Sequence, residues 1–364
     1  MICPHVHLRD WNEDAKETIL NGLNVAYLSG LDAVFEMPNT MPMLTSIINI
    51  EARLKRGGDA QTLLKMKYDD FEIFHGIYAG LTCFEKQIEE MVFAYNHHQQ
   101  IVGLKIYFGK STGNLSVIEP DEQKFVWKYL AKLGFTGLIA GHCEKQSFIK
   151  DDLWQPENSQ SHSIARPPIS EVESVKDQIQ FAEEAGFEGS FHICHISVPE
   201  TLDYILYKKD KVPFRMTCGV TPHHALLHDD MMSGKKGLYL KMNPPLRSKK
   251  MQESMLKSLF KGNIDWIETD HAPHTKQDKL TNYASGIPGL PFYPKFIDYL
   301  MDNGMDESLI QKITHTNILE AFGMDKQFIP NSHGKNRMKD YNFLASQYDF
   351  DAFHDCPTLV FQSA

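Results

Sequence analysis

Two histidines near the start of the chain, His5 and His7, are separated by a single valine. In an extended strand, residues two apart point to the same side, so both imidazoles would converge on one place. A convergent pair of neutral imidazoles suits Zn²⁺, Mn²⁺, Co²⁺ or Fe²⁺. Taken alone, the pair could equally be two ordinary histidines on a half-exposed strand. The metal hypothesis therefore depends on what else the chain supplies.

Three further residues of ligand type follow apolar runs. His142 lies in GHCEK, His195 in CHIS, and Asp270 ends WIETD. Singly, each histidine would more often be a hydrogen-bonded core residue, and Asp270 could cap the turn that follows. Together with the first pair they complete the ligands for two metal ions. His192 precedes His195 by three residues, so it points to the other face and is a poorer candidate.

Lys105 lies between Leu104 and Ile106 in a strongly apolar run. Burial lowers the pKa of a lysine, and the neutral amine can react with CO2. The carbamate that results would carry two oxygens, enough to bridge two metal ions. The alternative is a lysine that snorkels out from the strand end. The histidines at the neighbouring strand ends favour the carbamate.

This set of residues predicts a hydrolytic reaction. Two metal ions about 3.5–4 Å apart lower the pKa of a shared water from ~15.7 towards ~7 and polarise a carbonyl. Asp270 would take a proton as general base and return it to a leaving nitrogen as general acid. The chemistry fits hydrolysis of a cyclic amide, or its reverse.

Eight extended runs alternate with helical ones, which predicts a parallel sheet. They are Ile2–His7, Ala33–Met37, Glu72–Ile77, Val102–Phe108, Gly137–His142, Ser190–His195, Phe214–Val220 and Trp266–Asp270. The clearest helices are Asp121–Gly134, Ser170–Gly186 with a capping box at its start, Pro199–Lys209, Lys249–Gly262 and Phe292–Gly304.

An open doubly wound sheet would offer one crevice at a switch point, whereas only a closed ring brings all these strand ends together. We therefore predict a (β/α)8 TIM barrel with the metal site at the C-terminal ends of its strands. The barrel should cover about residues 2–325 of a single domain spanning 1–364, with an excursion at 146–168 and an irregular tail at 326–364.

Composition narrows the class of protein. The formal net charge is -10 and no dense block of Lys or Arg occurs, which disfavours nucleic acid and anionic membranes as partners. The six cysteines show no C-x-x-C pairing, and there is no apolar run of membrane-spanning length or signal peptide. We expect a cytoplasmic protein with a small-molecule substrate and, as its assembly, a homodimer.

The strings PHVHLRD, MPNT, GLKIY, GHCEK, CHIS, VTPHH, KMNPPLR, TDHAPH and SGIPG occur in this order between about Pro4 and Phe322. In these strings the chain resembles the dihydroorotase family of the amidohydrolase superfamily. The resemblance implies reversible cyclisation of N-carbamoyl-L-aspartate to L-dihydroorotate. It assigns His5, His7 and Asp270 to one metal ion, His142 and His195 to the other, and carboxylated Lys105 to both, with Zn²⁺ as the expected metal.

The resemblance also implies a set of substrate contacts. Recognition of the substrate carboxylate falls to Arg9, Asn39 and His274, and a guanidinium fork does match a carboxylate. Asn243, the backbone near Gly286 and Thr112 are further expected contacts, and His223 and His224 are weaker ones. Ser111 and Thr112 follow Lys105 in a loop that is either a lid or a plain connection.

Two departures from the resemblance stand out. Cys3 occupies a position where relatives usually carry Asp, which affects a contact behind a ligand. The N-terminal segment that builds a small β-sandwich in many relatives is expected to be absent or reduced. The rival functions are another cyclic-amide hydrolase (dihydropyrimidinase, hydantoinase or allantoinase) and a catalytically inactive scaffold. Arg9, Asn39 and His274 favour a carboxylate-bearing substrate, and all six ligand positions are retained.

Overall fold

A computed structural model describes residues 1–110, 115–324 and 338–354 of the chain. Eight strands form one parallel sheet in which each strand pairs with the next along the chain. They are β1 (Ile2–Val6), β2 (Ala33–Glu36), β3 (Phe74–Gly80), β4 (Ile101–Tyr107), β5 (Leu138–His142), β6 (Ser190–Ile193), β7 (Arg215–Val220) and β8 (Trp266–Ile267).

The sheet closes on itself just beyond its last strand. His271 forms a parallel bridge with Val6, and the backbone N–H of His7 donates to the carbonyl of His271 at 2.7 Å. Consecutive parallel pairing with this closing contact makes a (β/α)8 barrel. The predicted fold class is confirmed.

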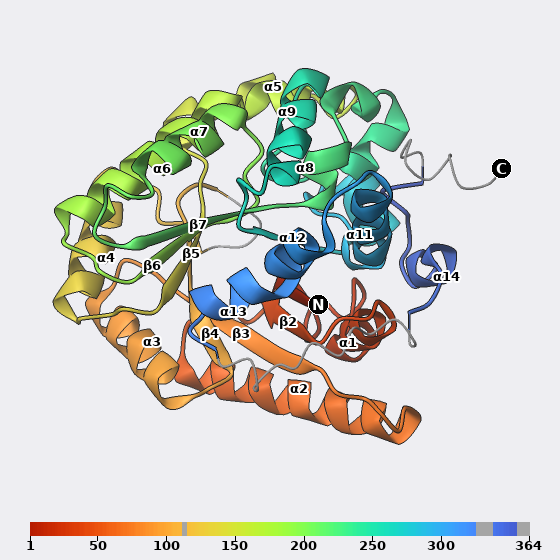
Figure 1. Ribbon diagram of the computed structural model, residues 1–364, viewed down its shortest axis with the longest axis horizontal. Helices are drawn as coiled ribbons and strands as arrows, with labels where there is room; N and C mark the ends of the chain where they lie inside the picture. Colours follow the sequence, from red (N-terminus) through yellow and green to blue (C-terminus); the bar gives the residue numbers. More distant parts are fainter. Residues whose placement is uncertain (111–114, 325–337, 355–364) are drawn as a thin grey trace.

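Helices surround the barrel, as Figure 1 shows. They are α1 (Ile19–Leu28), α2 (Ile47–Lys67), α3 (Glu85–His97), α4 (Pro120–Lys132), α5 (Ser161–Ala165), α6 (Pro168–Glu184), α7 (Pro199–Lys208), α8 (Pro222–Leu226), α9 (Lys249–Phe260), α10 (Lys276–Thr281), α11 (Tyr293–Asp302), α12 (Glu307–Gln311), α13 (Asn317–Ala321) and α14 (Tyr341–Ala345). Short helical turns are η1 (Gln146–Phe148), η2 (Asp151–Leu153), η3 (Asp229–Met232), η4 (Lys235–Leu240), η5 (Leu290–Phe292) and η6 (Lys312–Thr316). Among the described helices, none has the length and apolar character needed to cross a bilayer.

Several predicted strands are shorter than expected, and two of them, β6 and β8, end two or more residues early for a reason that matters for the site. Strands β6 and β8 end before His195 and Asp270, whose φ angles are 38° and 44°. A left-handed backbone cannot continue a strand, so both residues lie in the connections just beyond it. The predicted capping box at Ser170 was also wrong. Helix α6 begins at Pro168, and Ser170 lies inside it with its hydroxyl donating to the carbonyl of Pro167.

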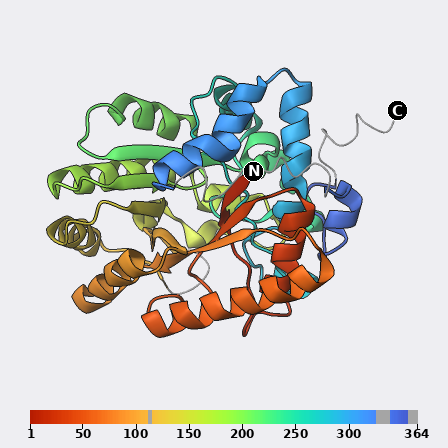
Figure 2. The same ribbon diagram turned by 60° about the horizontal axis from the view of Figure 1, so that its bottom comes forward.

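The apolar sequence of the strands fills the barrel and the layer between strands and helices. All seven residues of β4 are buried, Lys105 among them. The excursion after β5 contains η1, η2 and α5. The region after residue 325 includes α14, which lies beside α11 and α1 in Figures 1 and 2. Its aromatic residues enter the core, since Phe353 stacks on Phe292 with ring centroids 4.0 Å apart.

Candidate metal centre

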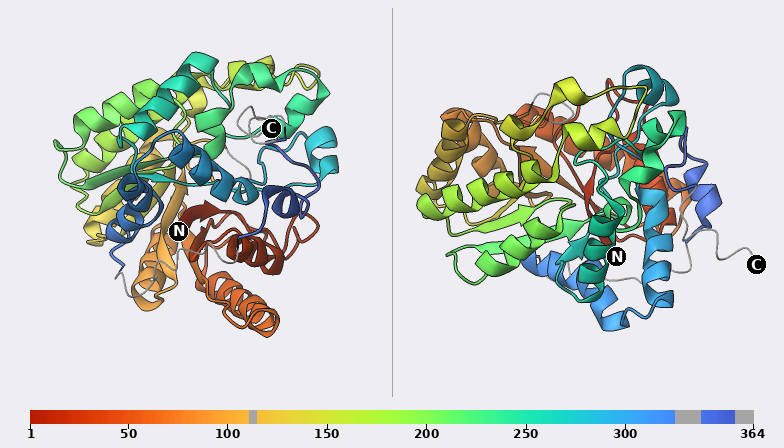
Figure 3. Two further views of the ribbon diagram at one scale, coloured as in Figure 1. Left: turned by 45° about the vertical axis from the view of Figure 1, so that its right-hand side comes forward. Right: turned by 90° about the horizontal axis from the view of Figure 1, so that it is seen from above.

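A cavity of about 380 Å³, its open mouth included, lies at the C-terminal ends of the strands. The connections that follow the strands build this end of the barrel, seen from two further directions in Figure 3. The cavity is lined by His5, His7, Arg9, Asn39, Tyr107, His142, His195, Asn243, Asp270, Ala272, Ser285 and Gly286. Nine residues singled out from the sequence therefore share one wall, although they come from six different strand ends and their loops.

His5, His7 and Asp270 form the first candidate ligand group. The Nε2 atoms of His5 and His7 lie 3.2 Å and 3.0 Å from Oδ1 of Asp270. All three side chains are buried, and their donor atoms are close enough to share one metal ion. The strand alternation that predicted convergence of the two imidazoles agrees with this arrangement.

His142 and His195 form the second group. Nδ1 of His142 lies 3.2 Å from Nε2 of His195, and both residues are buried. The His5 and His195 rings are 5.1 Å apart between centroids, so the two groups adjoin. Four imidazoles and one carboxylate meet in one cavity.

Lys105 lies beneath this cavity with no exposed surface. Its Nζ lies 3.1 Å from Sγ of Cys194 and 4.9 Å from the ring centroid of Tyr107. A lysine enclosed in this way does not snorkel to solvent. Carboxylation of its amine stays a prediction.

Polar groups behind the ligands determine which imidazole nitrogen faces the cavity. Oδ1 of Asn39 lies 2.7 Å from Nδ1 of His7, and Oε2 of Glu144 lies 2.9 Å from Nε2 of His142. Arg166 in turn binds Glu144 through three contacts of 2.6–3.2 Å. Such contacts orient a ligating imidazole and fix its tautomer. They leave Nε2 of His7 and Nδ1 of His142 turned towards the centre.

The protonation states of His7, His195 and Asp270 suit metal binding. At His5, burial alone would lower the pKa, but Asp270 raises it well above the usual value, so a metal ion would displace a proton there. Burial lowers the pKa of His7 to about 4, and burial together with His142 lowers the pKa of His195 well below its usual value. Burial alone would raise the pKa of Asp270, but His5 and His7 hold it well below the usual range. Neutral imidazoles beside an ionised carboxylate are the forms that bind divalent metals. The donor set therefore fits two metal ions on chemical grounds.

Arg9 provides the cation of the cavity. Its Nε donates to the carbonyl of Pro273 at 3.1 Å, and one terminal nitrogen lies 3.1 Å from Nε2 of His274. Its φ of 49° is left-handed, a strained conformation for a side chain of this size. The strained turn places the buried guanidinium beside the candidate ligands.

The other predicted substrate contacts divide into two groups. Asn243 and Gly286 line the cavity, and a Cβ at Gly286 would lie 2.6 Å from the carbonyl oxygen of Ala272, so only glycine fits. His274 lies behind Arg9 instead, with Nε2 3.0 Å from the carbonyl of Ser285. Thr112 and Ser111 fall outside the described residues.

Tyr107 is a cavity residue that the sequence argument did not single out. It ends β4, is buried, and its hydroxyl has no hydrogen-bond partner among the described residues. Its position two residues after Lys105 places both side chains on one face of the strand, which was a usable signal. Ser285 and Ala272 also line the cavity, and no motif pointed to their side chains.

Known proteins of similar sequence decide the family. The dihydroorotase of Halalkalibacterium halodurans is 32% identical over 290 residues, which are 79% of this chain and 62% of that protein. The dihydroorotase of Staphylococcus aureus is 31% identical over 330 residues, which are 88% of this chain and 72% of that protein. The chain belongs to the dihydroorotase family. No model of a protein family matches it, and it spans less than two thirds of the first of these dihydroorotases.

The fold of this dihydroorotase-family chain is similar to that of solved structures with other names as well. The L-hydantoinase (dihydropyrimidinase) from Arthrobacter aurescens superposes with a TM-score of 0.75 at 20% identity, covering 88% of this chain and 70% of that one. A dihydroorotase from Campylobacter jejuni superposes with a TM-score of 0.65 at 20% identity, and the superposition covers 89% of this chain and 83% of that one. At this identity the likeness concerns the barrel itself.

Proposed function

We propose that this chain catalyses the reversible cyclisation of N-carbamoyl-L-aspartate to L-dihydroorotate and water, a step of pyrimidine biosynthesis. The observation that carries the proposal is the buried Arg9 guanidinium in the same cavity wall as His5, His7, His142, His195 and Asp270. A cation beside a metal-binding group suits a cyclic amide that bears a carboxylate. Its sequence relatives are named dihydroorotase, which agrees.

The metal ligands would be divided between two ions. His5, His7 and Asp270 would hold one ion, His142 and His195 the other, and carboxylated Lys105 would reach both. Imidazole and carboxylate donors suit Zn²⁺. The ions would polarise the reacting carbonyl and make water a better nucleophile.

Asp270 would move the proton. Its carboxylate is ionised, because the histidines around it hold its pKa well below the usual range. In hydrolysis it would accept a proton from the attacking water and deliver it to the ring nitrogen as the C–N bond breaks. In cyclisation the same group would take the proton from the nitrogen.

Arg9 would bind the ring carboxylate of dihydroorotate. His274 and Pro273 hold its guanidinium from behind, which orients it without help from the substrate. Asn243, Asn39, Thr112 and the backbone at Gly286 would complete the pocket. Desolvation by the cavity walls strengthens such a charge-assisted pair.

A hydantoinase or dihydropyrimidinase activity is the second candidate, supported by the barrel's likeness to an enzyme of that name. Rates on dihydroorotate, dihydrouracil, hydantoin and allantoin decide between the two. We expect dihydroorotate to be preferred by orders of magnitude. Equal turnover of dihydrouracil would establish the second candidate instead.

We place this activity in the cytoplasm, with a homodimer as the assembly and no nucleic-acid or membrane partner. The described cysteines Cys3, Cys83, Cys143, Cys194 and Cys218 are all free, as a reducing compartment would leave them. Light scattering on the purified protein checks the assembly. A monomeric mass at micromolar concentration would exclude the homodimer.

A further inference from the structure

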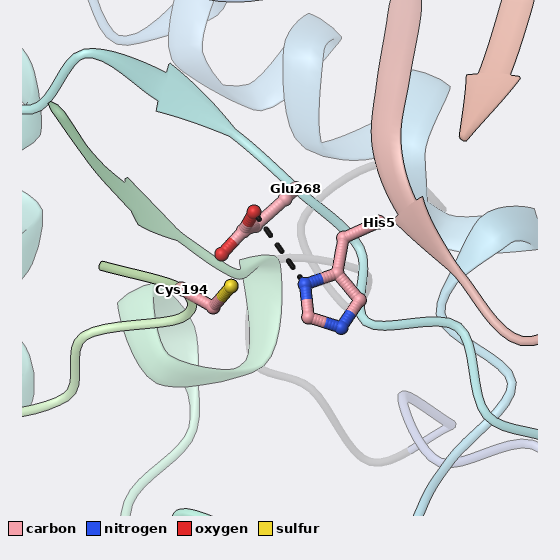
Figure 4. A group of neighbouring side chains, drawn as sticks. All are labelled: His5, Cys194 and Glu268. Atoms are coloured by element: carbon pink, nitrogen blue, oxygen red, sulfur yellow. Dashed lines mark ion pairs between the residues drawn. The ribbon is translucent and has the colours of Figure 1, made fainter. Parts of the chain in front are cut away.

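Glu268 is a buried carboxylate at the floor of the candidate metal centre, outside the predicted ligand set. It follows β8 and points between β1 and β6, where Figure 4 shows it facing His5 and Cys194. Its exposed fraction is 1%, so its charge must be balanced by protein groups.

The carboxylate of Glu268 touches both ligand groups. Its Oε1 accepts the backbone N–H of His195. Its Oε2 lies 3.6 Å from Nδ1 of His5, the ring nitrogen directed away from Asp270. That Nδ1 is buried and has no hydrogen-bond partner among the described residues. The Glu268 carboxylate therefore faces the ring of His5 and the backbone N–H of His195.

Two neighbours make the buried charge tolerable. Oε2 of Glu268 lies 3.1 Å from Nε2 of His192, and the His192 ring stacks on Trp266 at 4.1 Å between centroids. The indole Nε1 of Trp266 donates to the same oxygen at 3.4 Å. A paired carboxylate with several donors can stay ionised in the interior.

Gly219 on the neighbouring strand β7 provides the room that this side chain needs. A Cβ at residue 219 would lie 2.7 Å from Cδ and 2.8 Å from Oε1 of Glu268. Any other residue there would push the carboxylate away from His195. The fit between Gly219 and Glu268 indicates that the position of this carboxylate is specific.

We propose that Glu268 is a positioning residue of the metal centre, which orients the His5 ring through Nδ1 and restrains the strained backbone of His195. Its effect is to present Nε2 of both histidines to the cavity. The inference rests on the proposed function, because it assumes that His5 and His195 bind metal. Loss of a contact behind a metal-ligating histidine typically costs 10–100-fold in metal affinity.

The test measures metal affinity in place of activity. Zn²⁺ affinity is obtained by competition with a chelator, and the Co²⁺-substituted protein gives a visible spectrum that reports ligand geometry. In Glu268→Gln the side chain keeps its shape, but one oxygen becomes an NH2 group that faces N–H donors. We expect 10–100-fold weaker Zn²⁺ binding and a changed Co²⁺ spectrum.

Two further variants keep the result interpretable. Gly219→Ala retains the carboxylate but displaces it, and we expect a loss of affinity in the same direction even if Glu268→Gln folds poorly. Glu171→Gln is the matched control, because Glu171 is a buried carboxylate that accepts the backbone N–H groups of Ser197 and Val198 without touching a ligand side chain. It should lower thermal stability and leave metal affinity unchanged.

The outcomes separate this inference from the proposed function. A wild-type protein that binds no metal would remove the basis of both. Wild-type affinity and spectrum in folded Glu268→Gln and Gly219→Ala would overturn the positioning role alone. His5, Cys194 and Glu268 could themselves hold an ion. A third metal equivalent lost in Glu268→Gln and in Cys194→Ser would make Glu268 a ligand and overturn the positioning role too.

Discussion

The amine of Lys105 lies in contact with the thiol of Cys194, 3.1 Å from Nζ to Sγ, beneath the candidate ligand histidines. The amine is enclosed on strand β4 and directed at the floor of the cavity, where no solvent competes for it. A carbamate on this nitrogen would extend towards the two ligand groups. The position agrees with a bridging role and motivates a direct test.

Lys105→Ala should therefore lose both bound metal and activity. Short carboxylic acids such as acetate should restore part of the activity, since they can supply the missing oxygens to the space that the side chain leaves. Metal analysis and a dihydroorotate assay, with and without the acid, measure this. A bare amine in an active, metal-loaded crystal structure would refute the carbamate.

Removal of metal should abolish activity reversibly. Chelation followed by dialysis should leave a folded, inactive protein, because the apolar clusters of the barrel core include none of the candidate ligands. Zn²⁺, Co²⁺ or Mn²⁺ should restore the rate, with about two equivalents bound per chain. Circular dichroism is the control for folding, and full activity in metal-free protein would exclude the mechanism.

Asp270→Asn should slow the reaction while keeping the shape of the cavity. The amide cannot accept a proton, so kcat should fall by at least the ~10²–10⁴ typical of general acid–base catalysis. The acidic limb of the pH–rate profile for hydrolysis should change in the variant. In the wild type this limb reports the coupled site as a whole, since Asp270, His5 and His7 titrate together. Near-normal kcat in the variant would exclude Asp270 as the proton carrier.

Arg9→Met should impair turnover of dihydroorotate while leaving metal content intact. Removing one partner of a desolvated charge pair costs ~2–5 kcal/mol, which is about 30-fold to several thousand-fold in kcat/KM. Arg215→Met is the control, because Arg215 is exposed and lies outside the cavity wall. A harmless Arg9→Met would contradict the carboxylate pocket and favour a substrate without a carboxylate.

Glu36→Gln should destabilise the fold in a pH-dependent way. Glu36 is fully buried with Arg53, and its Oε2 lies 2.9 Å from Nε2 of His75. Burial alone would raise the pKa of Glu36, but Arg53 and His75 lower it to about 2. A depressed pKa stabilises the folded state at pH values above the pKa of the unfolded chain, near 4.5. That stabilisation is lost as the pH falls towards the folded-state pKa of about 2.

At pH 7 we therefore expect Glu36→Gln to lose ~3–5 kcal/mol of unfolding free energy, since an unpaired Arg53 stays buried. The difference in unfolding free energy between the variant and the wild type should shrink below about pH 4, because Glu36 of the wild type then approaches its own protonation. Urea denaturation at several pH values measures this. Glu183→Gln removes a half-exposed pair with Lys208 and should cost no more than ~1 kcal/mol at any pH.

The sequence was sufficient for the barrel and for naming the candidate ligands that the structure brings into one cavity. Strand alternation in His5-Val6-His7 is a local property, and eight alternations of strand and helix leave few architectures in which their C-terminal ends meet. The limits of the strands were harder to predict. His195 and Asp270 end apolar runs, yet their left-handed backbone takes them off the strand. Such conformations depend on surrounding contacts that the local sequence does not contain.

Tertiary structure alone decided how the candidate ligands are held. Glu144, Asn39 and Glu268 lie behind His142, His7 and His5, and only the folded barrel brings the last two of these pairs together. Which nitrogen of each imidazole faces the cavity depends on these contacts, as does the position of Arg9 against His274. The residue types that can bind a metal are readable in a sequence because they are properties of single side chains. The direction in which each lone pair points is a property of long-range packing, and it exists only once the barrel has closed.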